Sequence, residues 1–140
     1  MKRILVGIDG SSESKAAAAY AAQLAQATHS ALELAFVLPT IVETGLGGAS
    51  TINAWQTEQT DRARVMLEEL SQTVPRPHTP VETSLLEGSA AHRLAEEAQR
   101  PDIWLVVVGH RGRGAVQRTL LGSVADRLTQ ISPKPVLVFR

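Results

Sequence analysis

Short apolar runs alternate along the chain with longer segments that mix apolar and polar residues. The apolar runs at 3–9, 31–38, 81–86, 103–108 and 136–139 are predicted to be strands. The first and fourth runs are almost wholly apolar and rich in β-branched residues, the pattern of strands buried on both faces of a parallel sheet. The third run is shorter and more polar, which predicts a place at or near a sheet edge.

The segments between these runs predict four helices. They cover residues 13–28, a stretch from 52 or 53 to 74, residues 90–99, and residues 123–131. Serines or Gly-Ser pairs stand just before the first, third and fourth of them, as expected at helix starts. Residues 40–51 contain three glycines and no clear period. We expect a long mobile loop there, of the kind that is often functional.

This alternation predicts one α/β domain over residues 1–140, with a parallel sheet and helices on both faces. In such sheets ligands bind beyond the carboxyl ends of the strands, where the strand order switches. The polar residues 9–11 follow the first strand, and 109–112 follow the fourth. If these strands are neighbours, both loops line one crevice.

The stretch 109–123 has the parts of an anion site. Three glycines fall within residues 109–114, arginines lie close by, and Gly122-Ser123 stands at a predicted helix start. Glycines let the backbone approach a phosphate, and helix-start N–H groups point donors at it. No acidic residue lies between Asp102 and Asp126, so we expect a positive local field. The stretch matches neither a Walker A loop nor a dinucleotide fingerprint, and a flexible connection is the alternative.

Composition narrows the classes of function. Fourteen basic and fourteen acidic residues balance, which argues against a nucleic-acid binder. The chain has no cysteine, so disulfides and thiolate chemistry are excluded. The first apolar run is too short for a signal peptide or a membrane span, so we expect a cytoplasmic protein. The histidines show no metal-ligand spacing; they are His29, His78, His92 and His110.

The whole chain resembles the universal stress protein family. The resemblance is carried by residues 4–11 (Ile-Leu-Val-Gly-Ile-Asp-Gly-Ser), by Gly88, by the ending 134–138 (Lys-Pro-Val-Leu-Val), and by the spaced motif Gly109-x2-Gly112-x9-Gly122-Ser123. It implies a Rossmann-like fold with strand order 3-2-1-4-5. It also implies homodimers that pair through the last strand, Val136 to Phe139.

The glycine motif is similar to that of the ATP-binding members of the family. The resemblance implies that Gly109 lies against the ribose and that Gly112, Gly122 and Ser123 hold the phosphates. It further implies that Val37 offers main-chain hydrogen bonds to the adenine edge. Asp9 would contact the ribose or help to hold Mg²⁺ or Mn²⁺, although a turn or capping role is its alternative. The full expected site is Asp9, Gly10, Val37, Val108, Gly109, Arg111, Gly112, Gly122, Ser123 and Val124.

One position departs from the common family pattern, because His110 stands where Ser or Thr often follows the first glycine. Its imidazole either touches a phosphate or faces solvent. Among the arginines, Arg111 is the expected phosphate neighbour. The two tryptophans, Trp55 and Trp104, are interpreted as core or interface aromatics.

Three hypotheses of function follow. The preferred one is a stress-response protein that binds ATP or another adenine nucleotide and acts as a dimeric switch toward an unknown protein partner. The second is a slow ATPase or nucleotidyl transferase, for which His110 and Asp9 are the visible candidate bases. The third is a dimeric interaction module that binds no nucleotide.

Overall fold

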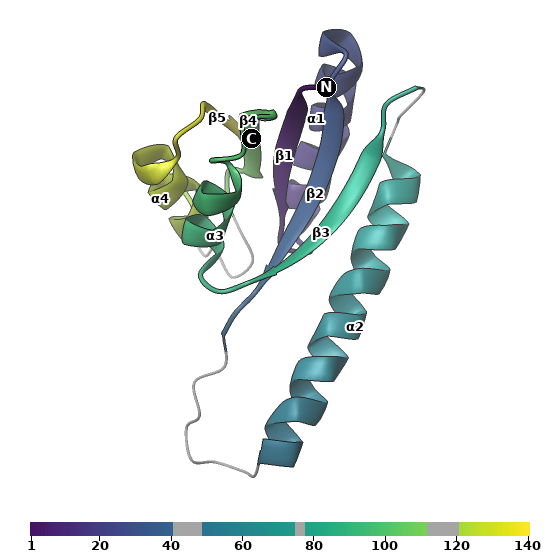
Figure 1. The fold of residues 1–140 in the computed structure, drawn as a ribbon, viewed down its shortest axis with the longest axis vertical. Coiled ribbons are helices and arrows are strands. Elements are labelled where there is room, and N and C mark those ends of the chain that lie inside the picture. Colours follow the sequence, from purple (N-terminus) through teal and green to yellow (C-terminus); the bar gives the residue numbers. More distant parts are fainter. Residues whose placement is uncertain (41–48, 75–77, 112–120) are drawn as a thin grey trace.

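The computed structural model describes residues 1–40, 49–74, 78–111 and 121–140. Within them one parallel sheet runs in the order β3-β2-β1-β4-β5 (Figure 1). The strands are β1 (Arg3–Ile8), β2 (Ala31–Leu38), β3 (Val81–Glu87), β4 (Ile103–Gly109) and β5 (Val136–Phe139). The predicted fold class and strand order are confirmed, and the polar third strand lies at an edge as predicted.

Four helices cover the sheet: α1 (Ser12–Thr28), α2 (Ala49–Thr73), α3 (Ala90–Glu97) and α4 (Ser123–Ile131). α1 and α2 pack on one face, and α3 and α4 pack side by side on the other (Figure 1). Side chains of β1 alternate between the two layers: Ile4 and Val6 join the core under α1, whereas Leu5 joins the core under α3 and α4. β1 is thus buried on both faces, as its apolar run predicts.

The alanine-rich sequence of α1 brings this helix close to the sheet. Its inward face consists of small side chains that are fully buried: Ala17, Ala18, Ala21, Ala22 and Ala25. The helix begins after Ser11, whose hydroxyl accepts from the Ser14 N–H at 3.1 Å. It ends at His29, which adopts the left-handed conformation with φ 54°. Both ends of α1 are therefore defined by local contacts.

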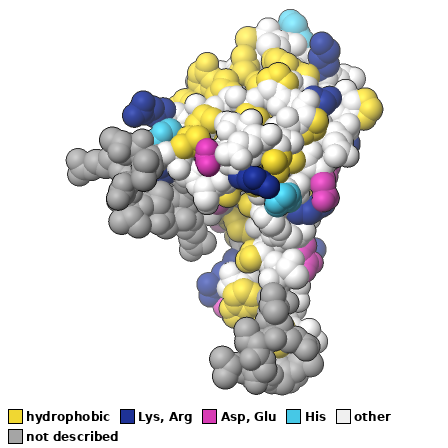
Figure 2. All heavy atoms as spheres, turned by 90° about the vertical axis from the view of Figure 1, so that its left-hand side faces the viewer, with side chains coloured by type: hydrophobic (Ala, Val, Ile, Leu, Met, Phe, Trp, Pro, Cys, Tyr) yellow, Lys and Arg dark blue, Asp and Glu magenta, His cyan; other side chains and the backbone are white. Residues whose placement is uncertain are grey.

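α2 begins at Ala49, earlier than the predicted start at 52 or 53. The end of the predicted 40–51 loop is therefore helical, and residues 41–48 lie outside the described part of the chain. The buried residues of α2 are Ala63, Leu67, Leu70 and Ser71, and all of them fall in its second half. Its first half runs on past the end of the sheet, as Figures 1 and 2 show. Helix formation there was missed because 49–51 carry no apolar stripe.

The two tryptophans differ in their surroundings. Trp55, in the projecting half of α2, is 47% exposed, so the core alternative of its interpretation fails and the interface alternative stays a prediction. Trp104 in β4 is half-buried against the core under α1, and its indole N–H donates to the Ser30 hydroxyl at 3.0 Å. The core interpretation therefore holds for Trp104 only.

Figure 2 looks onto the side of the molecule that carries α3 and α4. On this face basic and acidic side chains are interspersed among hydrophobic ones. None of the helices in the described ranges combines the length and the apolar character that a membrane crossing requires.

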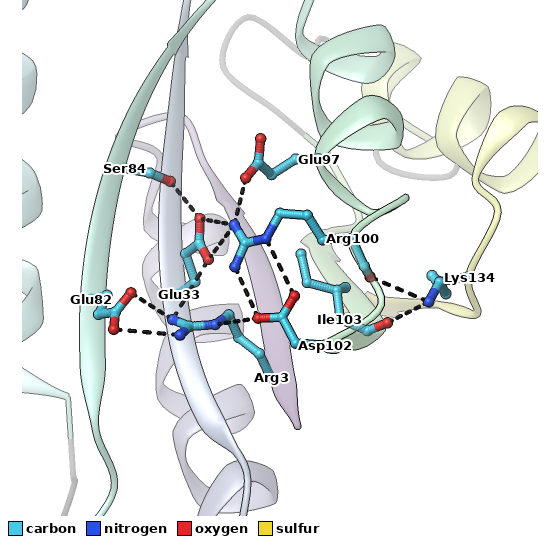
Figure 3. Close-up of polar contacts among 9 residues, drawn as sticks. All are labelled: Arg3, Glu33, Glu82, Ser84, Glu97, Arg100, Asp102, Ile103 and Lys134. Carbon is cyan, nitrogen blue, oxygen red and sulfur yellow. Dashed lines mark hydrogen bonds and ion pairs between the residues drawn. The ribbon is translucent and has the colours of Figure 1, made fainter. Parts of the chain in front are cut away.

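A buried carboxylate lies at the amino end of the sheet. Glu33 of β2 is 3% exposed and accepts from the Ser84 hydroxyl of β3 at 2.9 Å (Figure 3). The guanidinium of Arg100, just before β4, lies 3.1 Å from its carboxylate, and that of Arg3 in β1 lies 3.6 Å away. Two arginines and a hydroxyl thus compensate the charge that burial would otherwise make costly.

Further carboxylates extend this cluster toward solvent. Arg3 donates to Glu82 at 2.7 Å and to Asp102 at 3.1 Å, and Arg100 also donates to Asp102 at 3.0 Å (Figure 3). The hydrogen bond from Arg100 holds the pKa of the Asp102 carboxyl below its usual range, and Asp102 in turn raises the pKa of Arg100. We call Arg3, Glu33, Glu82, Arg100 and Asp102 the amino-end ion cluster. It joins β1, β2, β3 and the start of β4.

Candidate functional site

A pocket opens at the carboxyl ends of β1, β2 and β4, at the opposite end of the sheet from the ion cluster. The sheet order switches here, because β1 continues to β2 on one side and has β4 on the other. Six of the residues expected from the sequence line the pocket together: Asp9, Val37, Val108, Gly109, Arg111 and Val124. The crevice predicted from the strand ends is therefore present.

Apolar side chains form most of the remaining wall. Residues from β2 and from the starts of α3 and α4 contribute Ala35, Phe36, Ala90, Leu94 and Ala125. Gly7 of β1 lies beneath Leu94, where an added Cβ would come within 2.9 Å of the leucine side chain. These residues were not predicted, since apolar residues within strands and helices give no chemical signal in a sequence.

Asp9 organises the turn that leads from β1 into α1. Its Oδ1 accepts from the Ser11 N–H at 2.9 Å and from the Ser11 hydroxyl at 2.5 Å. Gly10 between them has φ +84°, a conformation in which L side chains are strained. The turn role considered for Asp9 is thus observed, whereas the residue that caps α1 is Ser11. Gly10 takes part through its backbone and is not among the residues that line the pocket.

Asp9 fits one mode of metal binding only. Among the residues that the structure describes, no three acidic or histidine side chains gather into a metal site. Mg²⁺ bound to nucleotides often takes one or two protein carboxylates and receives its other ligands from phosphates and water. A single pocket carboxylate such as Asp9 suits that mode.

Gly109 allows α1 to lie against the start of the loop that follows β4. A Cβ at this position would come within 3.2 Å of the Glu13 carbonyl carbon and 3.3 Å of the Ser14 nitrogen. Such contacts are tighter than backbone atoms accept without moving. Glycine therefore lets the two backbones approach this closely without displacement of either.

Arg111 is held by a carboxylate that sequence reasoning missed. Its backbone N–H donates to Glu13 Oε2 at 2.8 Å, and its guanidinium donates to Glu13 Oε1 at 2.9 Å. A carboxylate therefore opposes the expected positive field at this point, because the fold brings Glu13 from the first turn of α1 to Arg111. The signal was available in the adjacency of β1 and β4, which places the first turn of α1 beside the loop after β4.

The start of α4 closes the base of the same loop. The Gly122 N–H donates to the His110 carbonyl at 2.8 Å, and the His110 N–H donates to the Phe139 carbonyl at 2.6 Å. Val124 lines the pocket, whereas Gly122, Ser123 and His110 are not among its lining residues. Gly112 lies outside the described residues. The N–H expected at Gly122 for a phosphate is thus already used in this arrangement.

The helix starts give the pocket a polarity of their own. α1, α3 and α4 all begin at this end of the sheet, and pocket residues come from the first turn of each. The first N–H groups of a helix have no partner within it, and the helix dipole adds partial positive charge there. Two carboxylates oppose this partial positive charge: Asp9 in the pocket wall and Glu13 behind Arg111.

The fold and the pocket define an open, doubly wound α/β domain with a pocket at the switch in strand order. The chain belongs to the universal stress protein family, whose model matches residues 1–140. Universal stress protein YxiE of Bacillus subtilis is 29% identical over 145 residues, covering 99% of this chain and 98% of the relative. Universal stress protein MJ0531 of Methanocaldococcus jannaschii is 27% identical over 139 residues, covering 99% and 82%.

Solved structures agree with this assignment. A universal stress protein in complex with cAMP is 28% identical with a TM-score of 0.62, and the match covers 99% of this chain and 96% of that one. The universal stress protein from Archaeoglobus fulgidus in complex with dAMP is 20% identical with a TM-score of 0.74, and the match covers 100% and 98%. The second likeness establishes the shared fold.

Proposed function

We propose that this protein binds an adenine nucleotide in the pocket at the carboxyl ends of β1, β2 and β4. The observation that carries the proposal is the convergence of Asp9, Val37, Val108, Gly109, Arg111 and Val124 on one hollow. These residues come from four separate parts of the chain. The complexes of family members with cAMP and dAMP support an adenine nucleotide as the ligand class.

The wall chemistry orients the proposed ligand. Adenine suits the apolar side formed by Val37, Ala35 and Leu94. The β1–β2 ladder ends at Ile8 and Phe36, one residue before Val37, so the adenine edge can approach the main chain there. The ribose then falls near Asp9 and Gly109. The phosphates point toward Arg111 and the first turn of α4.

ATP is our preferred nucleotide, with Mg²⁺ or Mn²⁺ bound between its phosphates and Asp9. The preference rests on the spaced motif Gly109-x2-Gly112-x9-Gly122-Ser123, whose middle lies outside the described residues. The Gly122 N–H donates to the His110 carbonyl. A phosphate at this end would therefore bind the N–H groups of Ser123 and Val124, or would bind Gly122 after that hydrogen bond has broken.

We further propose that the protein is a homodimer that responds to nucleotide. β5 is an edge strand, and its residues Val136 to Phe139 are all apolar and only partly buried. Pairing with a second β5 would cover this edge. Nucleotide can then act as a switch by binding one state of the dimer more tightly than the other. Sedimentation equilibrium with and without ATP tests both steps, and a monomer at all concentrations would refute them.

Isothermal titration with ATP, AMP, cAMP and, as a control, GTP tests the site itself. We expect Val37→Trp to abolish adenine nucleotide binding, because the larger ring fills the apolar side of the pocket. Val65→Trp is the matched control, since Val65 is exposed on α2 and does not line the pocket. A folded Val37→Trp variant with unchanged affinity would place the ligand elsewhere. Mass spectrometry of any co-purifying small molecule provides an independent identification.

A further inference from the structure

The contact between Glu13 and Arg111 occupies the donors that an anionic ligand would need. One carboxylate oxygen takes the Arg111 backbone N–H at 2.8 Å, and the other takes its guanidinium at 2.9 Å. A backbone N–H carries a single hydrogen. An anion that bound the Arg111 backbone would therefore displace Glu13.

The position of Glu13 is imposed by the backbone. The absence of a side chain at Gly109 lets the first turn of α1 lie against the residue that leads into the loop. α1 is itself held by its buried alanine face and by the Ser11 cap. Since the helix is held in this way, the backbone of Glu13 stays beside the loop and its carboxylate remains within reach of Arg111.

Among the described residues, the charges in and beside the pocket include carboxylates as well as a cation. In the described part of the chain, Arg111 is the cation of the pocket wall, and Asp9 and Glu13 are the carboxylates in or beside it. Glu13 and Arg111 are each 29% exposed, so solvent screens their interaction only in part. A phosphate tail placed here gains from the guanidinium and is repelled by both carboxylates.

We infer that Glu13 is a specificity-determining residue, which makes the pocket select ligands by the negative charge of their phosphates. It holds Arg111 in the way that a phosphate would, and each added phosphate charge meets greater repulsion. The inference rests on the proposed adenine nucleotide site. It predicts that Glu13 lowers the affinity for neutral or singly phosphorylated ligands only slightly, and that it lowers the affinity for ATP without a divalent cation most.

Removal of this charge should change affinity in proportion to ligand charge. Isothermal titration compares adenosine, AMP, and ATP with EDTA or with Mg²⁺. For Glu13→Gln we expect unchanged affinity for adenosine, roughly threefold tighter binding of AMP and roughly tenfold tighter binding of metal-free ATP. Mg²⁺ and high salt should both reduce the gain for ATP. Glu13→Ala, which removes the hydrogen-bond acceptor as well, should give the same order of gains in affinity among adenosine, AMP and ATP.

Glu58→Gln is the matched control. It removes the same formal charge and also breaks an ion pair with an arginine, Arg62 at 2.5 Å, but it lies on the exposed face of α2. Its affinities should equal those of the wild type. Circular dichroism melts of each variant show that differences in affinity arise in folded protein.

The outcomes separate this inference from the proposed function. Wild-type binding with no gain for Glu13→Gln, or with an equal gain for adenosine and ATP, overturns the inference and leaves the nucleotide site standing. Weaker ATP binding by the variant overturns it as well, because Glu13 would then position Arg111 for the phosphate. Failure of wild type and variant to bind any of these compounds overturns both.

Discussion

Glu33 offers the sharpest test of how the fold is stabilised. The substitution Glu33→Gln keeps the size of the side chain and removes the buried negative charge. Its carboxylate accepts from Ser84 and faces two guanidinium groups, those of Arg100 at 3.1 Å and Arg3 at 3.6 Å. Once the charge is gone, these arginines lose their most buried counter-charge.

The expected loss follows from the burial of each partner. Removing one member of a buried ion pair typically costs about 3–5 kcal/mol. Here the arginine side chains are 15% and 37% exposed and keep contacts with Asp102, so the penalty is reduced. The glutamine can also still accept from Ser84. We therefore expect Glu33→Gln to lower the free energy of unfolding by about 2 kcal/mol.

Urea unfolding followed by far-ultraviolet circular dichroism, at fixed protein concentration and neutral pH, measures this loss. If the free energy of unfolding falls by about 2 kcal/mol per molar urea, the urea concentration at the unfolding midpoint should fall by roughly 1 M. Glu82→Gln is the control within the same cluster: it also contacts Arg3, but its side chain is 61% exposed, so we expect a loss of about 0.5 kcal/mol or less. Equal losses for the two variants, or no loss for Glu33→Gln, would refute the reasoning.

Three further predictions concern other parts of the described structure. Arg100 lowers the pKa of Asp102, so Asp102 stabilises the fold above its unfolded pKa of about 3.9 and stops doing so as pH falls through the lower folded value. Asp102→Asn should therefore flatten the acid limb of an unfolding titration, and an unchanged limb would contradict this. Gly109→Ala should cost roughly 1–3 kcal/mol in thermal melts, because its Cβ would crowd the backbone of α1; a neutral effect would mean that α1 shifts freely. Ser11→Ala should cost about 1 kcal/mol in urea, since it removes the cap of α1 and a partner of Asp9; equal stability would show that solvent replaces the cap.

Sequence reasoning recovered what local patterns determine. Apolar runs marked every strand, and the small inward face of α1 appeared as a run of alanines. The strand order came from the family resemblance and proved correct, which placed the residues after β1 and β4 beside each other. Six expected site residues consequently line one pocket.

Contacts between distant residues were out of reach. Glu33 sits inside an otherwise apolar strand, and its partner Arg100 is 67 positions later. Glu13 looked like an ordinary first-turn acid, and Arg111, its partner, is 98 positions away. Which carboxylate meets which guanidinium depends on how the strands and helices pack. The hydrophobic pattern and the spacing of residues in the sequence do not reveal that packing.

The main chain of His110 joins the edge strand β5 to the start of α4. Its N–H reaches the last residue of the edge strand β5, and its carbonyl receives the N–H of Gly122 at the start of α4. Displacement of the main chain at this one residue would strain both bonds. The sheet edge and the helix start are therefore connected through the main chain of His110. A strand that pairs with β5 and stabilises its contact with His110 would also raise the free energy needed to break the hydrogen bond between Gly122 and His110, so the two events would be thermodynamically linked.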